Sequence, residues 1–199
     1  MKRFSRWLAV ALIACGLAAC DKLQSGGPKF QLTDVTGAPF GKALALTDHT
    51  GKPRNLADFK GKIVVLFFGY TQCPDVCPTT LAEMGKVIKD LGPDGSKVQV
   101  LFVTVDPERD TPQLLAQYVT AFDPSFIGLY GDAEATKTVT REFKIYVDKK
   151  PTKSGGYTVD HSAGLFVLDG EGRLRLYGQP TAGVPVIAAD IRTLLKQAG

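Results

Sequence analysis

The sequence predicts a single α/β domain in which helices pack on a sheet whose central strands are buried on both faces. Two uninterrupted apolar runs, residues 62–69 (KIVVLFFG) and 97–105 (KVQVLFVTV), are typical of strands with protein on either side. Apolar residues at helical spacing follow each run, over 78–91 and over 111–122. This alternation of strand and helix predicts a sheet covered by helices.

The other elements extend this order on both sides. They are, in chain order, a hairpin made of residues 30–33 and 43–47, a short strand over 126–130, a helix over 133–143, strands over 163–169 and 173–177 joined by a glycine-rich turn, and a helix over 184–196. Residues 149–156 (KKPTKSGG) are expected to form a polar loop. The whole order is typical of a thioredoxin-like fold with an added N-terminal β-hairpin, in one domain over 30–199.

Composition is that of an ordinary globular domain. The 199 residues are 44% hydrophobic and 22% charged, which is enough apolar material for one core. The formal net charge is +4, and Lys2, Arg3 and Arg6 lie in a segment that we expect to be removed, so the mature balance is +1. A nearly neutral domain gives no electrostatic reason to expect nucleic-acid binding.

The N-terminus reads as an export signal. Residues 8–19 (LAVALIACGLAA) are apolar but fall short of the roughly 20 residues that span a bilayer. With the positive charges before them, they predict a signal peptide over 1–19. The sequence Leu-Ala-Ala-Cys at 17–20 resembles a bacterial lipobox, which implies lipidation of Cys20; an uncleaved anchor or an ordinary signal are the alternatives.

The residues after Cys20 bear on location. Asp21 resembles the inner-membrane retention signal of enterobacterial lipoproteins, so we expect the domain in the periplasm, anchored by lipid to the inner (cytoplasmic) membrane. Residues 20–29 contain Gly and Ser and predict a flexible tether.

Two cysteines remain in the mature domain. Cys73 and Cys77 lie four apart in the segment 68–81 (FGYTQCPDVCPTTL), so both sulfurs can share one face of a helical turn. They lie beside a predicted helix start, where the positive end of the helix dipole lowers thiol pKa. Three interpretations stay open: a structural disulfide bond, a redox-active dithiol, and a soft-metal site in which two thiolates favour Cu(I), with zinc next.

The histidines are not equivalent. His49 lies in a polar turn and is not expected to be a ligand. His161 lies just before the buried strand predicted over 164–168, where thioredoxin-like redox enzymes have a cis-proline that faces the cysteines. Imidazole and two thiolates suit copper and are one ligand short of structural zinc. The alternative is a histidine that only fixes the loop by hydrogen bonding, and Asp160 either orients the ring or is solvated.

Two further features, a charged segment and a methionine, have ordinary explanations. The charged segment 105–110 (VDPERD) is either a partner-docking loop or, as we favour, a solvated turn before a helix that Asp110 or Thr111 caps. Met84 has the helical spacing of a core residue.

Taken together, these motifs resemble those of the Sco/SenC family of copper proteins, which assist assembly of cytochrome c oxidase. The resemblance is carried by three blocks, 67–81, 103–119 and 159–172, together with the strand region before Cys73. It implies a thioredoxin-like fold and copper, as Cu(I) and/or Cu(II), on Cys73, Cys77 and His161. The family is usually membrane-anchored by a transmembrane helix, which a lipid anchor would replace here.

The resemblance also implies a function. Family members deliver copper to the CuA centre of cytochrome c oxidase subunit II, reduce the cysteines of that subunit, or do both, alongside other assembly factors. We therefore expect a metallochaperone without turnover of its own. The alternative is a thiol-disulfide oxidoreductase of the cell envelope that uses Cys73 and Cys77 as its redox pair.

Overall fold

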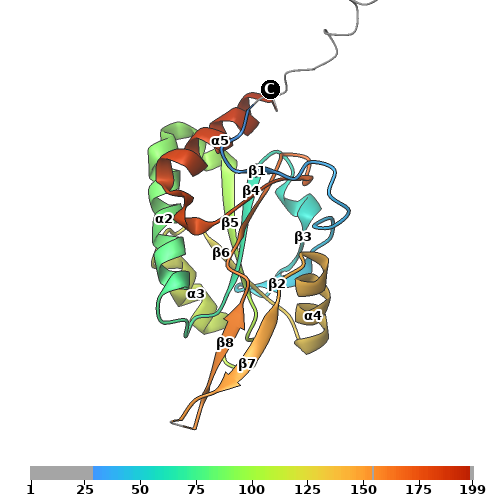
Figure 1. The fold of residues 1–199 in the computed structure, drawn as a ribbon, viewed down its shortest axis with the longest axis vertical. Coiled ribbons are helices and arrows are strands. Elements are labelled where there is room, and N and C mark those ends of the chain that lie inside the picture. Colours follow the sequence, from blue (N-terminus) through green and yellow to red (C-terminus); the bar gives the residue numbers. More distant parts are fainter. Residues whose placement is uncertain (1–28, 154, 198–199) are drawn as a thin grey trace, which may run out of the picture.

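A computed structural model describes residues 29–153 and 155–197 of the chain. The predicted signal peptide, Cys20 and all but the last residue of the predicted tether lie outside these described residues. Within them, an α/β domain is built on an eight-stranded mixed sheet (Figure 1). The structure confirms the predicted fold class.

Neighbouring strands of the sheet follow the order β1-β10-β9-β4-β5-β6-β2-β3. Their bounds, in that order, are Thr33–Asp34, Leu174–Gly178, Leu165–Leu168, Ile63–Gly69, Val98–Thr104, Ile127–Tyr130, Ala45–Asp48 and Pro53–Asn55. The pairs β4–β5 and β5–β6 are parallel, and the other pairs are antiparallel. The two uninterrupted apolar runs are therefore the central parallel strands, as predicted.

Strand β4 is apolar throughout because it has a core on each side. Phe67 faces the core formed with α2 (Val76–Leu91), α3 (Pro112–Thr120) and α5 (Val184–Gln197). Phe68, the next residue, faces the core formed with α4 (Ala133–Glu142) and the 3-10 helix η2 (Leu56–Phe59). Successive strand residues point to opposite faces, and both of these phenylalanines are fully buried. Two further 3-10 helices, η3 (Gly92–Lys97) and η4 (Pro180–Ala182), complete the helical elements of the described chain.

The N-terminal hairpin is formed by other segments than those predicted. Residues 33–34 pair with β10, so they do not pair with 43–47, and β2 pairs with β3 instead. Asp48 closes this hairpin by accepting the N–H groups of Thr50 and Lys52 and pairing with Arg54 at 2.7 Å. Burial opposes ionisation of Asp48, but these hydrogen bonds outweigh it and lower the pKa of the carboxyl to about 2. The local Asx-type turn at Asp48 thus joins β2 to β3, in place of the predicted hairpin between residues 30–33 and 43–47.

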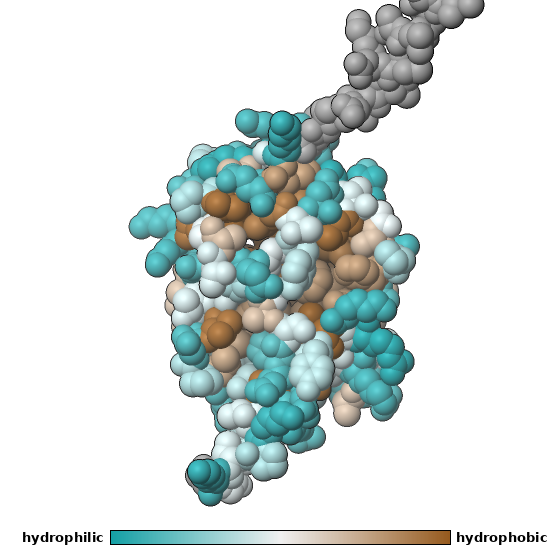
Figure 2. All heavy atoms as spheres, in the orientation of Figure 1, coloured by the Kyte–Doolittle hydropathy of each residue, from teal (hydrophilic) through white to brown (hydrophobic). Residues whose placement is uncertain are grey.

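The prediction of a polar loop over residues 149–156 is wrong in part. Residues 147–151 and 157–161 form β7 (Val147–Pro151) and β8 (Tyr157–His161), a separate two-stranded sheet. This hairpin projects at the lower end of Figure 1, where Figure 2 shows a mostly hydrophilic surface. Because Val159 is the one buried residue of its two strands, it lacks the hydrophobic alternation by which half-buried strands are predicted.

No helix among the described residues combines the length and the apolar character needed to cross a membrane. This statement covers residues 29–153 and 155–197 and not the segment predicted to be a signal peptide.

Candidate metal centre

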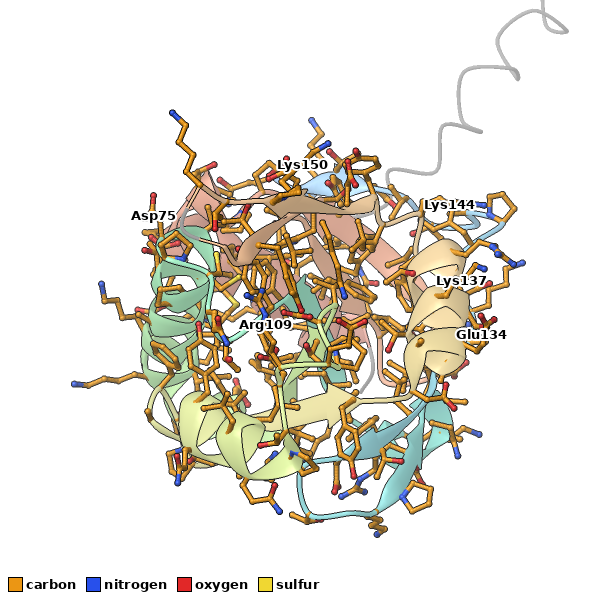
Figure 3. The ribbon with its side chains drawn as sticks, turned by 90° about the horizontal axis from the view of Figure 1, so that it is seen from below. Asp75, Arg109, Glu134, Lys137, Lys144 and Lys150 are labelled. Carbon is orange, nitrogen blue, oxygen red and sulfur yellow. The ribbon has the colours of Figure 1, made fainter. Side chains whose placement is uncertain are left out.

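Three side chains from two separate parts of the sequence meet below the carboxyl end of β4. Cys73 lies in the loop after β4, Cys77 in the first turn of α2, and His161 at the end of β8. Their ligand atoms all lie within 4.8 Å of one another, and Cys77 Sγ is 3.8 Å from His161 Nε2. Figure 3 views this end of the molecule from below, with Asp75 of the cysteine loop labelled. The structure therefore brings together the three residues that the sequence analysis selected.

The backbone approaches the buried thiol closely because residue 69 has no side chain. Helix α2 begins at Val76, two residues earlier than predicted, which places Cys77 in its first turn, fully buried. A Cβ atom on Gly69 would lie 2.7 Å from Cys77 Sγ and 2.7 Å from the Phe102 ring. The N–H of Cys73 donates to the carbonyl of Tyr70, which turns the half-buried Cys73 back toward Cys77.

A backbone carbonyl orients the imidazole. His161 Nδ1 lies 2.9 Å from the carbonyl oxygen of Ser162. Since a carbonyl only accepts, Nδ1 carries the proton and the lone pair of Nε2 faces Cys77. The ring also meets Tyr70 edge to face, with centroids 5.9 Å apart. The orienting role considered for Asp160, which is exposed, is thus performed by Ser162.

The two thiols have opposite electrostatic environments. A hydrogen bond from Cys77 lowers the pKa of Cys73 to about 3; burial opposes this shift, while the N–H groups of Asp75 and Cys77 add to it. The same hydrogen bond and deep burial raise the pKa of Cys77. Both cysteines are free thiols here. In the reduced pair one proton is therefore shared, with thiolate character at Cys73.

A buried carboxylate just before α3 supports the cysteine loop. Asp110 accepts the N–H of Thr71 at 3.1 Å, the hydroxyl of Thr71 at 2.6 Å and the hydroxyl of Thr104 at 2.6 Å. Asp106 and Asp110 are 0% and 1% exposed, so the solvated turn favoured for this segment is wrong for these two carboxylates, although Glu108 of the same turn is exposed. Carboxylates can be buried when donors satisfy them, and here the donors come from segments distant in sequence. The N-cap of α3 is Thr111, whose hydroxyl accepts the N–H of Leu114.

The remaining histidine and the helical methionine have structural roles. His49 Nδ1 accepts the backbone N–H of Gly128 at 3.0 Å, which ties the β2–β3 turn to β6. Met84 is fully buried in the core beside α2.

The donor set fits a soft metal ion. Two sulfurs and one imidazole nitrogen suit copper, while structural zinc ordinarily takes four protein ligands. The lowered pKa of Cys73 supplies one thiolate near neutral pH, and thiolate is the form that binds metal.

Comparison with known proteins agrees with this geometry. The family model for SCO1/SenC matches residues 31–196. The mitochondrial SCO2 homolog of Bos taurus is 36% identical over 197 residues, covering 94% of this chain and 74% of the relative. The structure of Bradyrhizobium japonicum ScoI with copper bound is 41% identical, with a TM-score of 0.73 over 78% of this chain and 99% of that one.

A third match is a lipoprotein. The crystal structure of a SCO1/SenC family lipoprotein from Bacillus anthracis is 25% identical, with a TM-score of 0.69 over 83% of this chain and 99% of that one. The chain spans a smaller share of several mitochondrial relatives, such as 55% of the zebrafish SCO2 homolog and 45% of yeast SCO2.

A family model that matches most of the chain, together with a shared fold, establishes that this protein belongs to the SCO1/SenC family.

Proposed function

We propose that Cys73, Cys77 and His161 bind one copper ion, and that the protein serves assembly of the CuA centre on cytochrome c oxidase subunit II. It would deliver copper, reduce the target cysteines, or do both. The convergence of the three ligand atoms within 4.8 Å carries the proposal. Two thiolates and one imidazole hold Cu(I) or Cu(II) without a full coordination shell, which leaves room for an incoming ligand.

Transfer would proceed by ligand exchange. Thiolates of the partner replace Cys73 and Cys77 one at a time, and loss of the His161 contact weakens the grip on the ion. His161 is suited to leave because β8 pairs only with β7, so its departure breaks no hydrogen bond of the eight-stranded sheet.

Anaerobic metal titration tests the ligand set. The reduced protein should bind one copper per chain, and the thiolate-to-copper charge-transfer band should disappear in Cys73→Ser and change in His161→Ala. His49→Ala is the matched control, because that ring bonds to Gly128 on another part of the sheet. Rapid disulfide exchange without stoichiometric copper would instead identify a thiol-disulfide oxidoreductase. Transfer is then measured from the loaded protein to a soluble subunit II fragment.

We further propose that residues 1–19 are a signal peptide, that Cys20 carries lipid, and that residues 20–29 tether the domain on the periplasmic side of the inner membrane. The Leu-Ala-Ala-Cys sequence at 17–20 supports this proposal, as does the existence of a family lipoprotein. Cys20→Ser should release the protein from the membrane fraction and remove the lipid mass. Membrane retention of this variant would show that another anchor acts.

A further inference from the structure

The hairpin that carries His161 depends on side chains for its attachment. Strands β7 and β8 pair with each other and belong to a separate sheet from the one that leads to Cys73. Main-sheet hydrogen bonds therefore set the distance between His161 and the cysteines only in part, through Leu165 of β9, which pairs with Phe67 of β4 four residues after His161. Among the described residues, most of the polar contacts that join the hairpin to the domain come from the turn between β5 and α3.

One guanidinium in this turn contacts both sides of the metal centre. Arg109 Nη1 donates to the backbone carbonyl of Tyr157 on β8 at 2.9 Å and to Gln72 Oε1 in the cysteine loop at 3.1 Å. Its Nε pairs with the fully buried carboxylate of Asp106. Figure 3 labels Arg109 near the middle of this view, with Asp75 of the cysteine loop to its upper left and Lys150 of the hairpin above it.

Tyr157 completes the attachment. The guanidinium carbon of Arg109 lies 3.8 Å from the centroid of the Tyr157 ring. The Tyr157 hydroxyl donates to Asp106 at 2.8 Å, so one carboxylate holds both the arginine and the tyrosine. Lys149 of β7 also pairs with Glu108 at 2.7 Å. A planar guanidinium that stacks and donates in two directions has no equivalent in lysine, whose ammonium is a point charge.

We infer that Arg109 is a positioning residue of the metal centre: by linking Gln72 to Tyr157, it fixes how far His161 stands from Cys73 and Cys77. This inference rests on the ligand set of the proposed function. Arg109 itself offers no atom to a metal, because a guanidinium has no acceptor. Its effect passes through the hairpin to the imidazole and through Gln72 to the cysteine loop.

Arg109→Lys tests the inference, with Arg54→Lys as the matched control. Arg54 is also paired with a buried carboxylate, Asp48, and lies 5.7 Å from an aromatic ring, but it belongs to β3, an edge strand of the main sheet, whereas Arg109 follows the central strand β5. In the metal-free protein, Arg109→Lys should accelerate amide hydrogen exchange in β8 by about tenfold, with the amides of α2 unchanged. Copper affinity, measured by chelator competition, should fall by about 10- to 100-fold, as for other groups that orient metal ligands.

The copper spectrum separates positioning from a merely structural role. The charge-transfer band of Arg109→Lys should shift toward that of His161→Ala, and Arg54→Lys should match the unaltered protein. Unchanged affinity and spectrum in Arg109→Lys overturn the inference, even if β8 exchanges faster. If Arg109→Lys does not fold, Tyr157→Phe decides: it removes the hydroxyl bond to Asp106, keeps the ring, and should show smaller shifts in the same direction.

The inference and the proposed function fail in different ways. If the unaltered protein binds no copper through Cys73, the ligand set is wrong and the inference about a metal centre falls with it. If the unaltered protein binds copper through Cys73, and Arg109→Lys has the same copper affinity and spectrum as the control Arg54→Lys, the ligand set stands and the positioning role is wrong.

Discussion

At the residue scale, the tertiary environment distinguishes two thiols that the sequence leaves equivalent. Cys77 is fully buried in the first turn of α2 and donates to Cys73, which is half-buried at the loop. The pKa of Cys73 is lowered and that of Cys77 is raised, so one sulfur is nucleophilic and ready to bind metal while the other holds the proton. A partner would therefore meet Cys73 first.

This difference predicts selective alkylation of the reduced, metal-free protein. With a pKa of about 3, Cys73 is almost wholly deprotonated from about pH 5 upward, so its labelling by iodoacetamide should hardly change between about pH 5 and pH 8. Labelling of Cys77 should be slow throughout. Peptide mass spectrometry over time measures both rates. In Cys77→Ala, which lacks the donated hydrogen bond, Cys73 labelling should slow at about pH 5, and equal rates for the two thiols would contradict the assignment.

Gly69 predicts a steric test. In Gly69→Ala the new methyl group would collide with Cys77 Sγ and the Phe102 ring, both at 2.7 Å, and overpacking of this kind costs about 1–3 kcal/mol. We expect urea denaturation to show that loss, and copper titration to show weaker binding. Gly156→Ala is the control, since its nearest neighbour would be 3.6 Å away. Equal stability of both variants would contradict the close approach.

At the scale of elements, the metal centre depends on how β4, β5 and α3 are joined. Asp110 precedes α3 and accepts from Thr71 after β4 and from Thr104 at the end of β5. These bonds hold the cysteine loop over the carboxyl ends of two parallel strands, where open α/β sheets place their sites. Asp110 thus holds the cysteine loop through Thr71, and Arg109 holds it through Gln72.

Removing this carboxylate should loosen the loop. Asp110→Ala leaves three donors without their acceptor. Because buried donors without an acceptor are destabilising, we expect the free energy of unfolding to fall by about 2–4 kcal/mol. Asp110→Asn keeps one acceptor oxygen and should lose less. Denaturant titration compares both with Asp123→Ala, whose carboxylate accepts only exposed local donors. A loss in Asp110→Ala no larger than in Asp123→Ala would show that the network is dispensable.

At the scale of the whole molecule, the contacts that attach the first described residues and the hairpin that carries His161 lie at opposite ends of the domain. The first described strand and α5 lie at the upper end of Figure 1, and the β7–β8 hairpin lies at the lower end. Asp190 of α5 accepts the N–H groups of Gln31 at 2.9 Å and Leu32 at 2.7 Å, across 158 positions of sequence. This carboxylate pins the start of the domain to its closing helix.

The separation predicts that stability and metal binding can be changed independently. Asp190→Ala should lower the free energy of unfolding by about 1–3 kcal/mol, because buried backbone donors lose their acceptor. Copper affinity of the folded variant should stay unchanged, since the substitution lies at the end away from the hairpin. A parallel fall in affinity would show that the two ends are coupled.

How much of the fold is predictable from the sequence depends on the range of the interactions. The runs over 62–69 and 97–105 predict β4 and β5 because burial on both faces leaves an unbroken apolar pattern. Helical periodicity predicts α2 to within two residues at its start. These signals are local, and so is the four-residue spacing that keeps Cys73, in the loop after β4, close to Cys77, in the first turn of α2.

The sequence by itself determined the central strands, the covering helices and the closeness of the two cysteines, because each depends on residues a few positions apart. Only the tertiary structure decided which strands pair, that Asp106 and Asp110 are buried, and that residues 147–151 pair with residues 157–161. It also decided that His161 meets Cys77 across 84 positions of sequence. The physical reason is that these features depend on partners distant along the chain, and their polar groups are stabilised only when those partners arrive.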